Sequence, residues 1–140
     1  MARVGAPAPD WTEPLAGGGE LTLRALRGKA VYLNFFATWC QPCNAEAPYI
    51  NALQKQYGPQ GLQTVGVDEE ETAGQALAFQ RRFKLVYPAV VDTGKLQDQY
   101  EVNGLPVHAF IDRHGVVRRI VVGEMKRNEI EAAIKQTLSS

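Results

Sequence analysis

The sequence predicts an α/β protein in which helices flank a central mixed β-sheet. Short apolar runs typical of buried strands alternate along the chain with longer segments whose apolar residues recur at helical spacing. With 140 residues, 45% hydrophobic content and no internal repeat, the chain has room for one hydrophobic core. We therefore expect a single domain that spans residues 1–140.

The first part of the chain predicts an arm followed by a hairpin. Pro7 and Pro9 disfavour a helix, and Trp11 is suited to anchor an extended arm on the domain. Residues 12–15 and 20–23 flank a run of three glycines, which predicts two short strands joined by a turn. An added N-terminal β-hairpin is therefore expected before the main sheet.

The next segments predict the central strand and the longest helix. Residues 29–36 are almost continuously apolar, which is typical of a strand buried on both faces. Residues 40–57 have the spacing of a helix with Ile50 and Leu53 on its inner face. Pro48 lacks the N–H that the helix needs at that position, so we expect a kink there.

The rest of the chain continues the alternation. The further strands are expected at residues 62–68, 86–92, 108–112 and 116–122. The further helices are expected at residues 72–83, 94–100 and 128–138. The acidic run from Glu69 to Glu71 suits the N-terminus of a helix, and we interpret it as a solvated cap rather than a metal site.

The only two cysteines, Cys40 and Cys43, form one Cys-x-x-Cys pair at the start of the long helix. A structural disulfide is disfavoured because so short a loop removes little entropy from the unfolded chain. A zinc site needs about four ligands, and the sequence offers no second ligand pair at a usable spacing. The pair therefore predicts a dithiol that cycles with a disulfide, in which one thiolate attacks and the other resolves, without a metal or a separate cofactor.

The position of the pair assigns the two roles. Cys40 lies at the expected helix N-terminus, where unpaired N–H groups and the helix dipole stabilise a thiolate, and Cys43 lies one turn inside the helix. Pro42 fits the first turn. Glu46 follows Cys43 by three residues and shares its face, so its carboxylate could take the proton of that thiol. A solvated helix glutamate is the alternative, and the spacing alone does not decide between them.

Charge and hydropathy indicate which classes of binding partner to expect. Fifteen basic residues balance fifteen acidic ones, so nucleic acid is not an expected partner. The chain has no long apolar run and does not start with a signal peptide, so membrane contact would need an anchor that is absent from this chain. A single redox pair is compatible with the cytoplasm and with an exported protein from which a leader was removed.

Residues 39–43, Trp-Cys-Gln-Pro-Cys, resemble the active-site motif of the thioredoxin superfamily. Motifs spread over nearly the whole chain are similar to those of the TlpA/ResA branch of thiol-disulfide oxidoreductases. They lie at residues 5–10, 26–29, 46–48, 87–88, 92, 100, 102–106, 110–115 and 123. The resemblance implies a thioredoxin-like fold and thiol-disulfide exchange.

The resemblance also implies roles for residues outside the cysteine pair. Pro106 would follow a cis peptide bond and face the cysteines, and Leu105 and Trp39 would form the rim of the substrate-binding surface together with Pro42. The family places a glutamate at the position of Glu46, which favours its catalytic interpretation.

One position departs from thioredoxin itself. Asn34 stands where thioredoxin has a buried aspartate on the central strand. Without a carboxylate on that strand, proton transfer at the cysteines falls to Glu46.

The leading functional hypothesis is an enzyme that reduces disulfides of protein substrates and is itself reduced by an unidentified thiol-disulfide electron donor. We expect a monomer. The resemblance implies a location outside the cytoplasm and a role in cytochrome c maturation or in extracytoplasmic thiol homeostasis. A protein-disulfide oxidase or isomerase is an alternative.

Two further classes fit the residues less well. A thiol peroxidase is disfavoured because Ala37 stands where peroxiredoxins have a threonine, and Thr38 is one residue too close. A copper chaperone on the same fold separates its cysteines by three residues, unlike this pair, although His108 could serve as its additional ligand. We interpret His108 as a hydrogen-bonded strand histidine more readily than as a group that tunes the thiols, and His114 as an exposed turn residue.

Overall fold

Five strands form a mixed sheet in the order β5-β4-β3-β6-β7 in this computed structural model, which describes residues 1–140. Strands β3, β4 and β5 run parallel, whereas β6 and β7 each pair antiparallel with their neighbour. The strands are β3 (Ala30–Phe36), β4 (Leu62–Asp68), β5 (Ala89–Val91), β6 (Val107–Ile111) and β7 (Val117–Val122). The predicted α/β class is confirmed, and β5 is shorter than expected because Pro88 cannot donate to a strand ladder.

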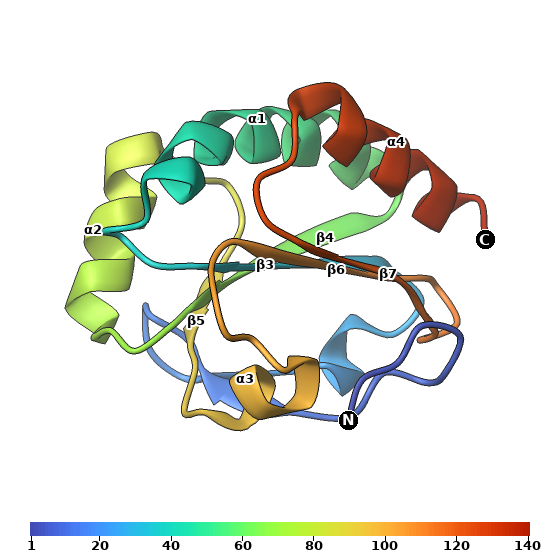
Figure 1. Cartoon of the computed structure of the whole chain (residues 1–140), viewed down its shortest axis with the longest axis horizontal. Helices are drawn as coiled ribbons and strands as arrows, with labels where there is room; N and C mark the ends of the chain where they lie inside the picture. The colour runs from blue at the N-terminus through green and yellow to red at the C-terminus, as the bar shows by residue number, and fades with distance from the viewer.

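Helices cover both faces of this sheet. They are α1 (Gln41–Tyr57), α2 (Ala73–Phe83), α3 (Lys95–Tyr100) and α4 (Arg127–Leu138), with short 3-10 turns η1 (Arg24–Leu26) and η2 (Gly58–Gln60). Figure 1 shows α1 and α4 above the sheet and α3 below it. Helix α1 continues through Pro48.

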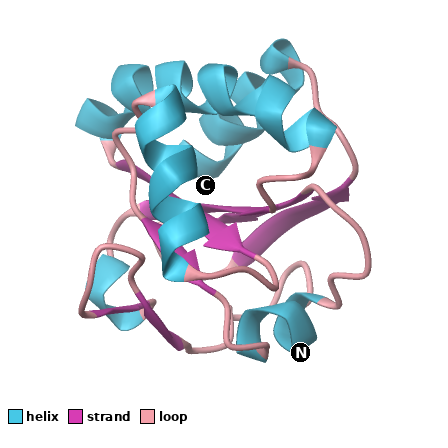
Figure 2. Cartoon of the chain, turned by 90° about the vertical axis from the view of Figure 1, so that its left-hand side faces the viewer, coloured by secondary structure: helices cyan, strands magenta, loops and turns pink.

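The N-terminal hairpin is confirmed. Strand β1 (Thr12–Pro14) pairs antiparallel with β2 (Glu20–Thr22), and Figure 2 shows these strands on the side of the sheet opposite α1 and α4. Trp11 anchors the preceding arm, since its side chain is only 2% exposed. The Ala8 N–H donates to the Gly115 carbonyl at 2.8 Å, which ties the arm to the turn before β7.

The alternation of side chains along β3 divides the core into two layers. Val31, Leu33 and Phe35 pack in the layer that contains Trp11 and the apolar residues of α3. Even-numbered positions face the other layer, which is filled from α1 and α4 by Ile50, Leu53, Ile130, Ala133 and Ile134. The expected inward face of α1, with Ile50 and Leu53, is therefore confirmed.

The register of β3 and β6 sets the position of the cysteines. Phe35 pairs with Val107, so the segment after β3 and the segment before β6 lie at the same edge of the sheet. Residues 37–40 lead from β3 into α1 at this edge, and Pro106 precedes β6 there.

None of the helices combines the length and the apolar composition that a membrane-spanning helix needs.

Candidate active site

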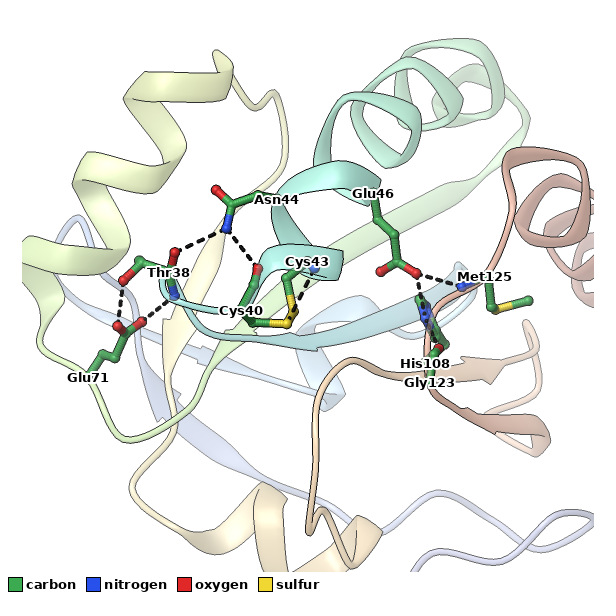
Figure 3. The surroundings of a disulfide bond; sticks show 9 residues. All are labelled: Thr38, Cys40, Cys43, Asn44, Glu46, Glu71, His108, Gly123 and Met125. Carbon is green, nitrogen blue, oxygen red and sulfur yellow. Dashed lines mark hydrogen bonds and ion pairs between the residues drawn. A yellow bond between two sulfur atoms is a disulfide. The ribbon is translucent and has the colours of Figure 1, made fainter.

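The two cysteines form a disulfide at the N-terminus of α1, as Figure 3 shows. Their Cα atoms are 5.2 Å apart, and both side chains are buried. Cys40 is the N-cap of α1, and the Cys43 N–H donates to Cys40 Sγ at 3.3 Å. Pro42 lies within the first turn. The predicted position of Cys40 at a helix N-terminus is confirmed, and on reduction the same N–H would face a Cys40 thiolate.

The residues expected at the substrate surface lie around this pair. The Trp39 side chain is 74% exposed, although tryptophan is a large apolar residue. Leu105 packs on the apolar cluster that contains both cysteines, and the Leu105–Pro106 peptide bond is cis, as the resemblance implies. Trp39 and Leu105 also line an open pocket of about 460 Å³.

A network of hydrogen bonds holds the segment that carries Trp39 and Cys40. The Glu71 carboxylate accepts the Thr38 N–H at 2.8 Å and the Thr38 hydroxyl at 2.5 Å. The Asn44 side-chain amide donates to the Thr38 carbonyl at 3.1 Å and to the Cys40 carbonyl at 2.8 Å. Figure 3 shows these contacts on both sides of the segment. The Thr38 hydroxyl is thus bound to Glu71 and is not free to serve a cysteine as in a peroxidase.

The interpretation of the acidic run as a solvated cap is wrong for Glu69 and Glu71. Glu69 is only 4% exposed, and Glu71 binds Thr38. The N-cap of α2 is instead Thr72, whose hydroxyl accepts the Gln75 N–H. The run folds inward because it follows β4 directly, where the Glu69 N–H donates to the Phe36 carbonyl at 2.9 Å.

Burial and hydrogen bonds shift the pKa values of three carboxyl groups beside this network. Burial and a hydrogen bond with Glu71 raise the pKa of Asp68 to about 9. Burial opposes ionisation of Glu71 as well, but hydrogen bonds from Asp68 and Thr38 outweigh it and lower the pKa of Glu71. Burial and a hydrogen bond with Asp92 likewise raise the pKa of Glu69 to about 10. Burial therefore favours the protonated form of Asp68 and Glu69, whereas the hydrogen bonds at Glu71 favour its ionised form.

Glu46 is buried on α1, three residues after Cys43. Its side chain is 1% exposed, which excludes the alternative of a solvated helix glutamate. Oε2 accepts the Met125 N–H at 2.7 Å and lies 3.3 Å from His108 Nε2. Oε1 is buried without a hydrogen-bond partner, on the side of the carboxylate that faces the cysteines in Figure 3.

His108 is a buried, hydrogen-bonded strand histidine, as predicted. Nδ1 lies 2.7 Å from the Tyr32 hydroxyl, and Nε2 lies 3.1 Å from the Gly123 carbonyl oxygen. Both ring nitrogens are therefore engaged and neither is free to ligate copper. His114 is exposed, as expected. No group of three or more His, Cys, Asp or Glu side chains has an arrangement that could hold a metal ion.

Residues 4–120 match the AhpC/TSA family. The chain belongs to this family. Among the relatives of this chain, thiol-disulfide oxidoreductase ResA of Geobacillus kaustophilus is 40% identical over 132 residues, which cover 91% of this chain and 74% of that protein.

Solved structures show the same fold. A thiol:disulfide interchange protein of the thioredoxin family from Chlorobium tepidum superposes with a TM-score of 0.88 at 28% identity and covers 99% of both chains. The exposed lipoprotein thioredoxin Etrx1 of Streptococcus pneumoniae superposes with a TM-score of 0.75 at 29% identity, and the match covers 91% of this chain and 99% of that one. The chain is therefore a thiol-disulfide oxidoreductase enzyme with a thioredoxin-like fold, as the resemblance implied.

Proposed function

We propose that this enzyme reduces disulfides in other proteins, with Cys40 as nucleophile and Cys43 as resolving thiol. The observation that supports these roles is the N-cap position of Cys40, toward which the Cys43 N–H points at 3.3 Å. The Cys40 thiolate attacks a substrate disulfide, and one substrate sulfur leaves as a thiolate. Cys43 then attacks Cys40 Sγ, the second substrate sulfur leaves, and two electrons have passed to the substrate.

Glu46 is the proposed proton acceptor for the resolving step. Cys43 must lose its proton before it attacks, because the thiolate is the nucleophile. The unpartnered, buried Oε1 of Glu46 is the candidate acceptor on this side of the disulfide. Asn34, on the neighbouring strand, offers no carboxylate in its place.

The proposed substrate is an extended polypeptide segment that lies across the cysteines. The exposed Trp39 ring and Leu105 provide apolar contacts next to the pair. Pro42 in the first turn of α1 and the backbone beside Pro106 complete this surface.

The physiological setting belongs to the same proposal. We place the enzyme outside the cytoplasm, as a monomeric single domain reduced by a dedicated thiol-disulfide donor. It would serve cytochrome c maturation or extracytoplasmic thiol homeostasis. The pneumococcal relative supports this location, since it is described as an exposed lipoprotein.

The first experiment is the reduction potential of the Cys40/Cys43 pair in a defined thiol-disulfide buffer. A reductant should have a potential of roughly −270 mV or lower, close to that of thioredoxin. A potential near the oxidising end of the range, about −120 mV, would contradict the proposed direction and indicate an oxidase or isomerase.

The second experiment tests Glu46. Glu46→Gln keeps the size of the side chain and removes the proton acceptor, so disulfide reduction should slow by about 10²-fold, at the lower end of the contribution of general bases. Glu124→Gln is a matched control, because Glu124 is exposed and makes no side-chain hydrogen bond or ion pair. Equal rates for the wild type and Glu46→Gln would remove Glu46 from the mechanism.

A further inference from the structure

A buried histidine lies against the carboxylate of Glu46. His108 on β6 is 0% exposed, and its Nε2 is 3.3 Å from Glu46 Oε2. Figure 3 shows the imidazole directed at the same oxygen that accepts the Met125 N–H. The contact joins α1 to the central sheet.

The neighbours of the ring decide which nitrogen carries a hydrogen. Nε2 faces two groups that can only accept, the Gly123 carbonyl at 3.1 Å and the Glu46 carboxylate at 3.3 Å. Nδ1 faces the Tyr32 hydroxyl at 2.7 Å, which can donate to a bare nitrogen or accept from a protonated one. Nε2 therefore bears a hydrogen in both the neutral ring and the imidazolium. This hydrogen is donated to the Gly123 carbonyl, and the carboxylate oxygen lies 3.3 Å from the same nitrogen.

The other titratable groups around the carboxylate are two tyrosines and the cysteines. Burial raises the pKa of Tyr32 on β3 and of Tyr87 before β5, and the nearby charge of Glu46 adds to both shifts. No lysine or arginine forms an ion pair with Glu46. The Met125 N–H and the His108 ring are thus the polar groups in contact with Oε2 of this buried carboxylate.

We propose that His108 is a positioning residue for the resolving step, acting through Glu46 and so resting on the role proposed for Glu46 above. The Met125 N–H that donates to Oε2, and the His108 ring nitrogen 3.3 Å from the same oxygen, hold the carboxylate and leave Oε1 as the free acceptor. The proton passes from Cys43 Sγ to Glu46 Oε1, the Cys43 thiolate forms the bond to Cys40, and the substrate sulfur leaves with the electron pair.

Two substitutions at the same position separate this role from packing. His108→Asn keeps a polar group opposite the Tyr32 hydroxyl but has no atom in the place of Nε2. His108→Gln reaches the place of Nε2 with an amide N–H. Tyr57→Phe controls for lost stability, since it removes the hydrogen bond to Glu131 at the far end of α1.

The assay follows one turnover of the reduced full-length protein with one equivalent of a chromogenic aryl disulfide. The first coloured thiolate released reports the attack by Cys40, and the second reports closure by Cys43. Because the leaving group needs no proton, the pH profile of the second release reports deprotonation at Cys43.

The expected result is that His108→Asn moves the acidic limb of this profile upward by about one pH unit, the shift produced by loss of one hydrogen-bond donor to a charged group. At a pH below the limb the second release then slows about tenfold. His108→Gln should restore the wild-type limb, and Tyr57→Phe should leave it in place. In a Glu46→Gln background, His108→Asn should have no further effect.

Several results would overturn the inference. The first is that the acidic limb of His108→Asn lies at the same pH as that of the wild type. The second is that His108→Gln shifts the limb as much as His108→Asn does. The third is that His108→Asn still shifts the limb in the Glu46→Gln background. If Glu46→Gln slows the second release while His108→Asn does not, the inference fails and the proposed role of Glu46 stands. If Glu46→Gln leaves the second release unchanged, the role of Glu46 fails first and the role of His108 falls with it.

Discussion

Replacing Glu71 by glutamine should loosen the segment that presents Trp39 and Cys40. The carboxylate accepts two hydrogen bonds from Thr38, at 2.8 and 2.5 Å, whereas an amide has one acceptor oxygen. Hydrogen bonds to charged groups contribute about 1.5–3 kcal/mol each, so Glu71→Gln should lower the free energy of unfolding by about 2 kcal/mol. Thr38→Val removes only the hydroxyl donor and should cost about as much.

A double-mutant cycle isolates this contact. Urea unfolding of the oxidised wild type, Thr38→Val, Glu71→Gln and the double variant should give a coupling energy of about 1 kcal/mol or more. Thr12→Val is the control, because Thr12 is exposed and its side chain makes no hydrogen bond, so its effect should add to that of Glu71→Gln. A coupling between Thr38 and Glu71 below about 0.5 kcal/mol, within the usual scatter of additivity, would refute the reasoning.

Three further predictions concern the cysteines, a buried acid and the exposed ring. Cys43→Ser should form a mixed disulfide with the substrate that is visible on non-reducing gels. Cys40→Ser should lose reductase activity, because only Cys40 attacks the substrate. Turnover by Cys40→Ser would contradict this assignment. Asp68→Asn should make stability less dependent on pH: the native carboxyl keeps its proton up to about 9, against an ordinary pKa of 3.8. The native state then binds one more proton than the unfolded chain, so the free energy of unfolding of the wild type falls as pH rises through this range. The slope is about 1.4 kcal/mol per pH unit. Urea unfolding of both proteins at about pH 6 and about pH 8 checks this, and equal slopes would exclude a buried protonated Asp68. Trp39→Ala should raise the KM for a protein disulfide with little loss of stability, since the ring is 74% exposed; an unchanged KM would remove Trp39 from the binding surface.

Local sequence patterns were sufficient to predict the helices, the strands and the redox-active cysteine pair. The sequence predicted the bounds of β4, residues 62–68, and the structure confirms them. Helix α1 begins one residue after Cys40, as expected for a strand followed by Cys-x-x-Cys and a helical period. The spacing from Cys43 to Glu46 placed both side chains on one helix face, and both are buried.

The acidic run and His108 show where local patterns stop. Three consecutive glutamates before a helix indicate a solvated cap, but the chain turns inward after β4 and buries Glu69. The histidine two residues after Pro106 was expected to be hydrogen-bonded, and it is. Nothing in its own segment indicated that Glu46 would be the group beside Nε2.

The sequence by itself determined the fold class, the redox pair and the face of α1 that carries Glu46, because periodicity and spacing act over a few residues. The tertiary structure decided which polar groups contact one another. Glu71 meets Thr38 across 33 residues, Tyr32 meets His108 across 76, and Met125 meets Glu46 across 79. These contacts exist because β3 lies between β4 and β6 in the sheet. Strand order depends on the packing of the whole core, so no local pattern can specify which polar groups it brings together.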